Sequence, residues 1–193
     1  SVTSMSHMFV YATSFNGDLS GWDVSNVVDM AGMFREAKMF NGDLSGWDVS
    51  KVTSMGGMFY SASAFDGDTS TWDVSRVANM EGMFAGASLF NHELSKWNMA
   101  SVTSLAGMFS KATSFNGDVS KWDVSRVMDM TGMFSWAKEF NGDISKWDVS
   151  SVTHMDYMFQ DAVSFKQKLC GAAWVNSKAV NKAGTIGMFA GSP

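Results

Sequence analysis

The chain has 193 residues and a formal net charge of −5, and 46% of its residues are hydrophobic while 17% are charged. This length and this composition indicate one packed domain and exclude a disordered chain. The longest apolar run is only a few residues, which excludes a membrane span, and the acidic balance argues against a nucleic-acid partner.

The first fifteen residues, SVTSMSHMFVYATSF, match the second half of a unit that recurs throughout the chain. We expect them to supply a helical arm without its strand. The first strand would then have an unpaired edge, of the kind that solenoids normally cover with a cap. The sequence has no start methionine and no leader, so we expect a processed product or a piece of something longer.

One unit of twenty-five residues recurs from Phe15 onward, first as FNGDLSGWDVSNVVDMAGMFREAKMF over residues 15–40. A fixed period of this length is the signature of a solenoid, in which each unit buries its apolar face against its neighbours. Two columns of the repeat have no gap: Trp22, Trp47, Trp72, Trp97, Trp122 and Trp147, and Phe9, Phe34, Phe59, Phe84, Phe109, Phe134 and Phe159.

Each unit predicts one strand and one helical arm. Residues 19–24 have the LxxLxL spacing of the short strand in leucine-rich repeats. From Val27 to Ala37 the apolar residues follow the i, i+3, i+7 spacing of an amphipathic helix, and Ser25 is suited to cap it. The predicted fold class is an α/β solenoid of about seven 25-residue units, each with a short parallel strand and a short helical arm.

A glycine column interrupts the predicted helical arms, where each glycine should cost about 1 kcal/mol relative to alanine. Either the arms approach so closely that no side chain fits, or each arm is two short helical turns with a break at the glycine. The change of the column to His7 in the first unit and Tyr157 in the last favours close approach. The column consists of Gly32, Gly57, Gly82, Gly107 and Gly132.

The pattern decays after Asp161. Trp174 stands two places later than the period predicts and Gly187 five places later. We therefore expect a repeat domain over residues 1–169 and a degenerate C-terminal capping unit over residues 170–193. Residues 162–193 carry a net charge of +4, which marks either a docking end for an acidic surface or ordinary solvated lysines. The candidate docking residues are Lys166, Lys168, Lys178 and Lys182.

An aspartate column occupies the fifth place of each predicted strand, where side chains should point outward onto the concave face. One interpretation is an oxygen-rich strip for cations, sugar hydroxyls or a protein. The interpretation that we favour is structural: the carboxylates accept bonds from nearby serines or amides, aided by lysines two places earlier. The candidate partner surface consists of Gly21, Asp23, Asp48, Asp73, Lys96, Asn98, Lys121, Asp123, Lys146 and Asp148.

A second acidic column follows the asparagine-glycine turn of each unit. An aspartate in this position commonly binds local backbone amides, and we expect that role here. The spacing does not resemble the nonapeptides of a calcium-binding β-roll. The column consists of Asp18, Asp43, Asp68, Glu93, Asp118 and Asp143.

The side chains of the tryptophan column could have either of two orientations, which predict different functions. Turned inward, the indoles form a core with the phenylalanine and methionine columns; turned outward, they form an aromatic ramp for sugar rings. We expect the inward arrangement, because the tryptophan shares its side of the strand with a valine. Leu105 replaces one methionine, which fits a core and not a thioether metal site.

The sequence contains no pattern that predicts catalysis or a cofactor. A nucleophile and its base would have to be unique departures from the repeat, and the departures are conservative or terminal. His7, His92 and His154 lie in different columns, so no metal cluster is predicted. Cys170 is the one cysteine, which excludes an internal disulfide, and we expect it to be packed.

The unit FNGDLSGWDVSNVVDMAGMF resembles the repeat of BspA-like and mycoplasma-lipoprotein-type surface proteins, a relative of leucine-rich repeats. The resemblance covers residues 1–169 through the F-N-G-D, W-D-V-S and M-x-x-M-F blocks. It implies a right-handed solenoid with no shared catalytic residue. For many members it implies exposure on the cell surface, with adhesion or binding of a host protein.

Three functions are consistent with this reading. The first is a non-catalytic protein-binding module that uses its strand face for adhesion or recognition, outside the cell or on its surface. The second is a structural subunit or scaffold of a larger assembly, held by its open N-terminal edge or its lysine-bearing C-terminal end. The third is a glycan-binding protein that uses exposed aromatic columns.

Overall fold

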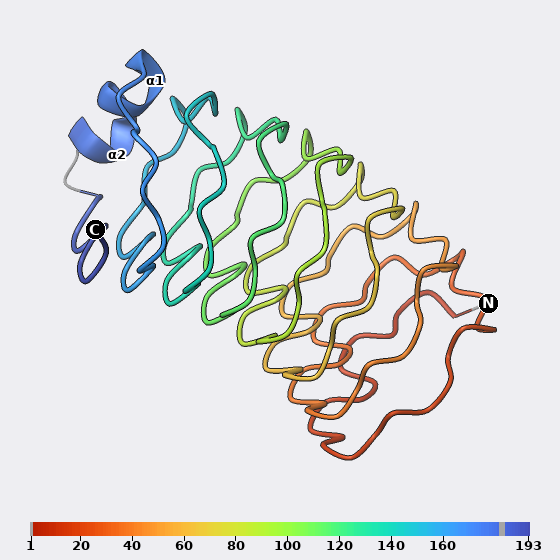
Figure 1. The fold of residues 1–193 in the computed structure, drawn as a ribbon. Helices are drawn as coiled ribbons and strands as arrows, with labels where there is room; N and C mark the ends of the chain where they lie inside the picture. Colours follow the sequence, from red (N-terminus) through yellow and green to blue (C-terminus); the bar gives the residue numbers. More distant parts are fainter. Residues whose placement is uncertain (1, 182–183) are drawn as a thin grey trace.

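The computed structural model describes residues 2–181 and 184–193, which form a stack of coils. Successive coils lie side by side in chain order, so the two ends of the chain lie at opposite ends of the stack (Figure 1). Helices are nearly absent from the described residues, which contain α1 (Ala172–Val175) and α2 (Lys178–Asn181). Strands are replaced by isolated parallel bridges at 25-residue intervals, from Ser4 with Asp29 to Asp129 with His154.

The predicted fold class, a leucine-rich-repeat-like α/β solenoid with a strand and a helical arm in each unit, is therefore wrong. Neither α1 nor α2 lies in a repeated arm. The bridges lie at Asp29 and its equivalents, inside the segment for which a helix was predicted, and not in residues 19–24. What repeats is a coil built from turns and extended segments.

The predicted strand does not form because its backbone amides donate hydrogen bonds to acceptors within the same segment. The Ser20 amide donates to Asp18 Oδ1 at 2.9 Å, and the Trp22 amide donates to the Leu19 carbonyl at 3.1 Å. The Ser25 amide then donates to Asp23 Oδ1 at 3.1 Å. Aspartate side chains that bind the backbone in this way compete with sheet ladders, so these donors cannot pair with a neighbouring coil.

The predicted helix is replaced by consecutive turns. The amides of Met30, Gly32 and Phe34 donate to carbonyls of the next coil, at residues 54, 56 and 58, over 2.8–3.0 Å. The amide of Met33, and that of Arg35 after Phe34, instead donate to carbonyls three residues back. A helix would require every amide to donate four residues back. The apolar spacing therefore arises from turns that all present one side to the core.

The glycine column is explained by backbone conformation and not by close approach. Its members have φ values of 57–62°, and His7 and Tyr157 keep the same conformation with φ of 58° and 57°. A Cβ atom at Gly57, Gly82, Gly107 or Gly132 would meet no atom closer than 3.5 Å. Positive φ is the usual requirement at the third residue of a type II turn, so the expectation of crowding was wrong for these four glycines. At Gly32 both reasons apply, because a Cβ atom there would lie 2.7 Å from the His7 ring.

A second column with positive φ lies four residues later and mostly carries side chains. The left-handed conformation costs an L-residue roughly 1–2 kcal/mol, and the sequence gives no sign of it here. Hydrogen bonds from backbone amides of one coil to carbonyls of the next coil hold these residues in this conformation. The column contains Tyr11, Glu36, Ser61, Gly86, Lys111, Trp136 and Asp161.

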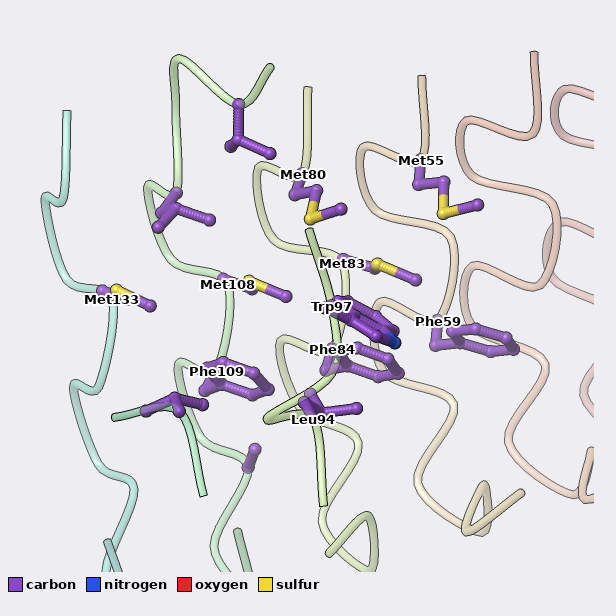
Figure 2. Packing of buried hydrophobic residues seen from close by; sticks show 14 of the residues in the cluster. Met55, Phe59, Met80, Met83, Phe84, Leu94, Trp97, Met108, Phe109 and Met133 are labelled. Atoms are coloured by element: carbon purple, nitrogen blue, oxygen red, sulfur yellow. The ribbon is translucent and has the colours of Figure 1, made fainter. Parts of the chain in front are cut away.

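The core consists of aromatic and methionine columns that run through the stack (Figure 2). Phe84 is fully buried and stacks on Phe59 and Phe109 with ring centroids 5.5 and 5.8 Å apart. The inward arrangement of the tryptophan column is confirmed: its members from Trp47 to Trp147 are 2–4% exposed, while Trp22 in the first units is 39% exposed. Each buried indole also donates to a backbone carbonyl 28 residues earlier.

An asparagine ladder joins the coils at the turn before the second acidic column. Asn16 Oδ1 accepts the Asn41 amide at 2.8 Å, and Asn41 Oδ1 accepts the Asp66 amide at 2.8 Å. The same bond recurs at every 25-residue step as far as the Lys166 amide. Each coil is thereby held in register with the next one by a side chain whose position is set by the repeat.

The last coil keeps the core columns although its sequence is irregular. The indole of Trp174 donates to the Ile144 carbonyl at 3.2 Å, and Phe189 stacks on Phe159 with ring centroids 5.4 Å apart. Trp174 belongs to α1, and α2 lies between the two contacts, where the additional residues of this coil are found. Cys170 is exposed, so the expectation that it is packed was wrong. The division between residues 169 and 170 stays a prediction.

Replacing Thr69 by valine should stabilise the protein by about 1 kcal/mol. Thr69 is fully buried in a column otherwise filled by leucine, valine or isoleucine, and its hydroxyl has no hydrogen-bond partner among the described residues. Valine removes this unsatisfied group and keeps the shape. Thermal unfolding would measure the gain. Thr53→Val is the control, because the Thr53 hydroxyl donates to the Val28 carbonyl at 3.2 Å; a higher melting temperature for the control alone would contradict the prediction.

Candidate functional site

The two acidic columns form one candidate surface, called here the acidic face. Most of its carboxylates are fixed by the serine two residues later: Asp123 Oδ1, for example, accepts from the Ser125 amide at 3.1 Å and from its hydroxyl at 2.6 Å. Asn98 keeps the backbone part of this arrangement, accepting from the Ala100 amide at 3.1 Å. The predicted hydrogen bonds from nearby serines and amides are therefore confirmed for the aspartates of both columns, whereas Glu93 accepts the Asp118 amide of the next coil at 2.9 Å. Among the described residues, the hydrogen bonds of Asp123 all involve Oδ1, which leaves Oδ2 for a partner.

All ten residues of the predicted partner surface are exposed, and the repeat places the equivalent ones in adjacent coils. The lysines of this surface, however, lower the pKa values of carboxyls in the second acidic column, and not in the column of Asp123 as expected. After the hydrogen bonds from Ser120, Lys121 lowers the pKa of Asp118. The pKa of Asp143 is likewise lowered first by hydrogen bonds from Ser145 and then by the charge of Lys146.

Positive charge is spread unevenly over the acidic face. In its N-terminal half, six carboxylates face two cations, a net charge of −4; in its C-terminal half, five carboxylates face four cations, a net charge of −1. The N-terminal half consists of Asp18, Asp23, Asp43, Asp48, Asp68 and Asp73 with Lys51 and Arg76, and the C-terminal half of Glu93, Asp118, Asp123, Asp143 and Asp148 with Lys96, Lys121, Arg126 and Lys146.

A second candidate surface is a row of three hollows on the turns, called here the turn groove. The first hollow, of about 360 Å³, includes Arg35, Tyr60 and Glu81. It shares Tyr60 with the second, of about 320 Å³, which extends to Lys111. The third, of about 480 Å³, is lined by Lys111, Thr113, Trp136 and Lys138. The turn groove was not predicted. The signal that could have indicated it is the variation of the column that contains Lys111 and Trp136, which carries a different residue in every unit.

A family model described as "Mycoplasma protein of unknown function, DUF285" matches residues 1–97 and again residues 87–192. The chain belongs to this family. The two successive matches confirm that this DUF285 chain is a repeat protein of the mycoplasma type. A search of curated proteins found no match.

The lysines of the predicted docking end are distributed along the last part of the DUF285 chain. Lys166 and Lys168 are exposed and precede α1, and Lys178 is exposed at the start of α2. Lys182 lies outside the described residues. A docking role for this end stays a prediction.

Two further observations concern other types of site. The described part of the DUF285 chain contains no group of three or more histidine, cysteine, aspartate or glutamate residues arranged to hold a metal ion. Among the same residues, no helix has the length and the apolar character needed to cross a membrane.

The stability of the DUF285 chain should fall as the pH is lowered below about 4, the ordinary range of aspartate. Serine hydrogen bonds lower the pKa values of ten aspartates in the acidic face, with the hydroxyl or the amide as the largest cause. A carboxyl whose pKa is lower in the folded state stabilises the fold above its unfolded pKa. That stabilisation is lost as the pH falls through the folded pKa.

Urea unfolding at pH 7, 5, 3 and 2 would measure this dependence. The midpoint should change little between pH 7 and 5 and fall at pH 3 and 2. The double variant Asp123→Asn/Asp148→Asn should show a shallower decline, because it lacks two of the titrating groups. A midpoint that stays constant down to pH 2 would contradict the prediction.

Proposed function

We propose that this DUF285 chain is a non-catalytic repeat module that binds a basic protein segment along the N-terminal half of the acidic face. The observation that carries the proposal is the net charge of −4 on this half, with its aspartates exposed. Because Ser25 and its equivalents lower the pKa values of these carboxyls, they are ionised at neutral pH.

The geometry favours an extended partner. Each coil offers the same pair of carboxylates, so the pairs repeat from coil to coil along the stack. The like charges raise one another's pKa, as Asp18 and Asp68 do for Asp43. A row of lysine or arginine side chains would relieve this repulsion, with fast and salt-dependent association. The resemblance to BspA-like surface proteins supports a role in recognition or adhesion at a cell surface.

Substitution of aspartate by asparagine provides a sharp test, because Asn98 already occupies this column and keeps the backbone bond. The variant is Asp23→Asn/Asp48→Asn/Asp73→Asn. The probe is a fluorescent deca-arginine peptide, whose binding is measured by anisotropy at low and moderate salt. We expect the variant to bind at least about tenfold more weakly, as for the loss of several complementary charges.

The control is Asp123→Asn/Asp148→Asn, in the half where lysines and an arginine balance the carboxylates. It should bind the peptide nearly as well as the unmodified chain. Equal losses in both variants, or no binding by the unmodified chain, would overturn the proposal.

A structural subunit of a larger assembly is the second candidate, and the exposed apolar residues of the end coils favour it. Met8 and Tyr11 in the first coil are 46% and 68% exposed, and Ile186 and Phe189 in the last coil are 63% and 46% exposed. Sedimentation over a range of concentrations separates the two candidates. A stable monomer supports the binding module, and association that Phe189→Ser weakens supports the subunit.

A glycan-binding surface made of the tryptophan column is not retained. Five of its six members are buried and donate their indole N–H groups to backbone carbonyls.

A further inference from the structure

We propose that the turn groove binds an acidic polysaccharide that carries uronate or sulfate groups. The anionic groups would pair with Arg35, Lys111 and Lys138, and one sugar ring would lie on the indole of Trp136. This inference does not depend on the proposed function, because residues 29–38 and their equivalents in the other units form the turn groove, whereas the acidic face comes from other positions.

The charge of the turn groove is opposite to that of the chain. Its lining contains three residues with permanent positive charge and one carboxylate, Glu81, in a protein with a net charge of −5. The Glu81 carboxylate accepts the Ser104 hydroxyl at 2.8 Å, so a hydrogen bond already occupies part of it. The cations lie in the first and third hollows and at the junction of the second and third. Such spacing suits a ligand with anionic groups at intervals along a chain.

The aromatic residues of the turn groove have two different roles. The ring of Tyr60 is covered by the Arg35 guanidinium, which lies 4.1 Å from its centroid. Tyr60 therefore positions a cation. The side chain of Trp136 is 42% exposed, and it makes no ring contact with another aromatic residue among those described. A partly exposed indole that lines the same hollow as Lys111 and Lys138 is suited to contact with the apolar face of a sugar ring.

The shape of the turn groove also favours a polysaccharide. Gly82 and Gly107 belong to its lining. The nearest atom to a Cβ at Gly107 would be the Ser110 Cβ at 3.9 Å, whereas the Tyr60 ring lies 3.5 Å from that position at Gly82. Each hollow falls in the size range of small-ligand sites, and shared lining residues place the three in a row along the stack. Nucleic acid is less suitable, because its binding requires the neutralisation of many phosphates and the chain as a whole is acidic.

The experiment uses isothermal titration calorimetry of the full chain with four probes. These are an octasaccharide of alternating glucuronate and N-acetylglucosamine, its sulfated form, a neutral glucose hexasaccharide and a single-stranded DNA octamer. We expect binding of one or both acidic sugars, and weaker binding of the other two probes. Tighter binding of the DNA, equal binding of the neutral sugar, or no binding of either acidic sugar would overturn the proposal.

Variants taken from the repeat itself test the residues with little risk to the fold. Trp136→Ser copies Ser61 in the same column, and Lys138→Ser copies Ser63 and Ser88. Each should weaken binding of the acidic sugar about tenfold, which corresponds to about 1.4 kcal/mol. Lys121→Thr, which copies Thr71, is the control on the acidic face and should leave the affinity unchanged. Equal affinity for Lys138→Ser and the unmodified chain would contradict the assignment, even if Trp136→Ser failed to fold.

Discussion

Replacing Phe84 by alanine should lower the free energy of unfolding by about 3–5 kcal/mol, as for other buried aromatic residues. Phe84 is fully buried, and its ring centroid lies 3.9 Å from that of Phe90 and 5.5 and 5.8 Å from those of its neighbours in the column. Alanine would leave a cavity between three coils. Urea unfolding followed by tryptophan fluorescence would measure the loss.

Phe9→Ala is the matched control for this prediction. Phe9 stands at the end of the column, stacks on Phe34 at 5.4 Å, and is only partly buried. The same truncation should therefore cost clearly less at this position. Equal losses at Phe9 and Phe84 would show that the column does not stabilise the stack through contacts on both sides of each ring.

The second large effect is expected for Gly117→Ala, at about 1–3 kcal/mol of destabilisation. A Cβ atom at Gly117 would fall well inside van der Waals contact with the His92 carbonyl oxygen, which belongs to the backbone and cannot rotate away. His92 itself takes the place that glycine has in most other units. Thermal unfolding of the variant would measure the loss.

Two other glycines separate steric conflict from backbone conformation. Gly107 has a φ of 62° but open space around its Cβ position, so Gly107→Ala should cost roughly 1–2 kcal/mol through conformation alone. Gly46 has no atom within 4 Å of that position and its φ is not positive. Gly46→Ala should therefore be nearly neutral, and a large loss there would contradict this account of the glycines.

The repeat and its columns could be predicted because burial depends on position within the unit. The inward tryptophans and the local bonds of aspartates such as Asp18 followed from spacing and from side-chain chemistry. The backbone could not be predicted in the same way. Apolar residues spaced as in a helix are also compatible with consecutive turns. Positive φ at Glu36 or Trp136 cannot be recognised from the residue type, because neither residue is typical of that conformation.

The two candidate surfaces differ in the same respect. The acidic face repeats in nearly every unit, so its columns were visible in the sequence before the structure. The turn groove depends on differences between units, such as Gly86 beside Lys111 and Trp136 beyond it. Gly86, Lys111 and Trp136 are far apart in the sequence, and it is the fold that brings these residues with positive φ into adjoining hollows.

The asparagine ladder has a consequence for how such a protein changes in evolution. Because Asn16, Asn41 and their equivalents make the same bond at each step, duplication or loss of one whole period at the gene level would leave every surviving junction intact. An insertion of one or two residues inside a period would misalign all the columns beyond it. Growth in whole periods is therefore the change of length that this architecture tolerates best.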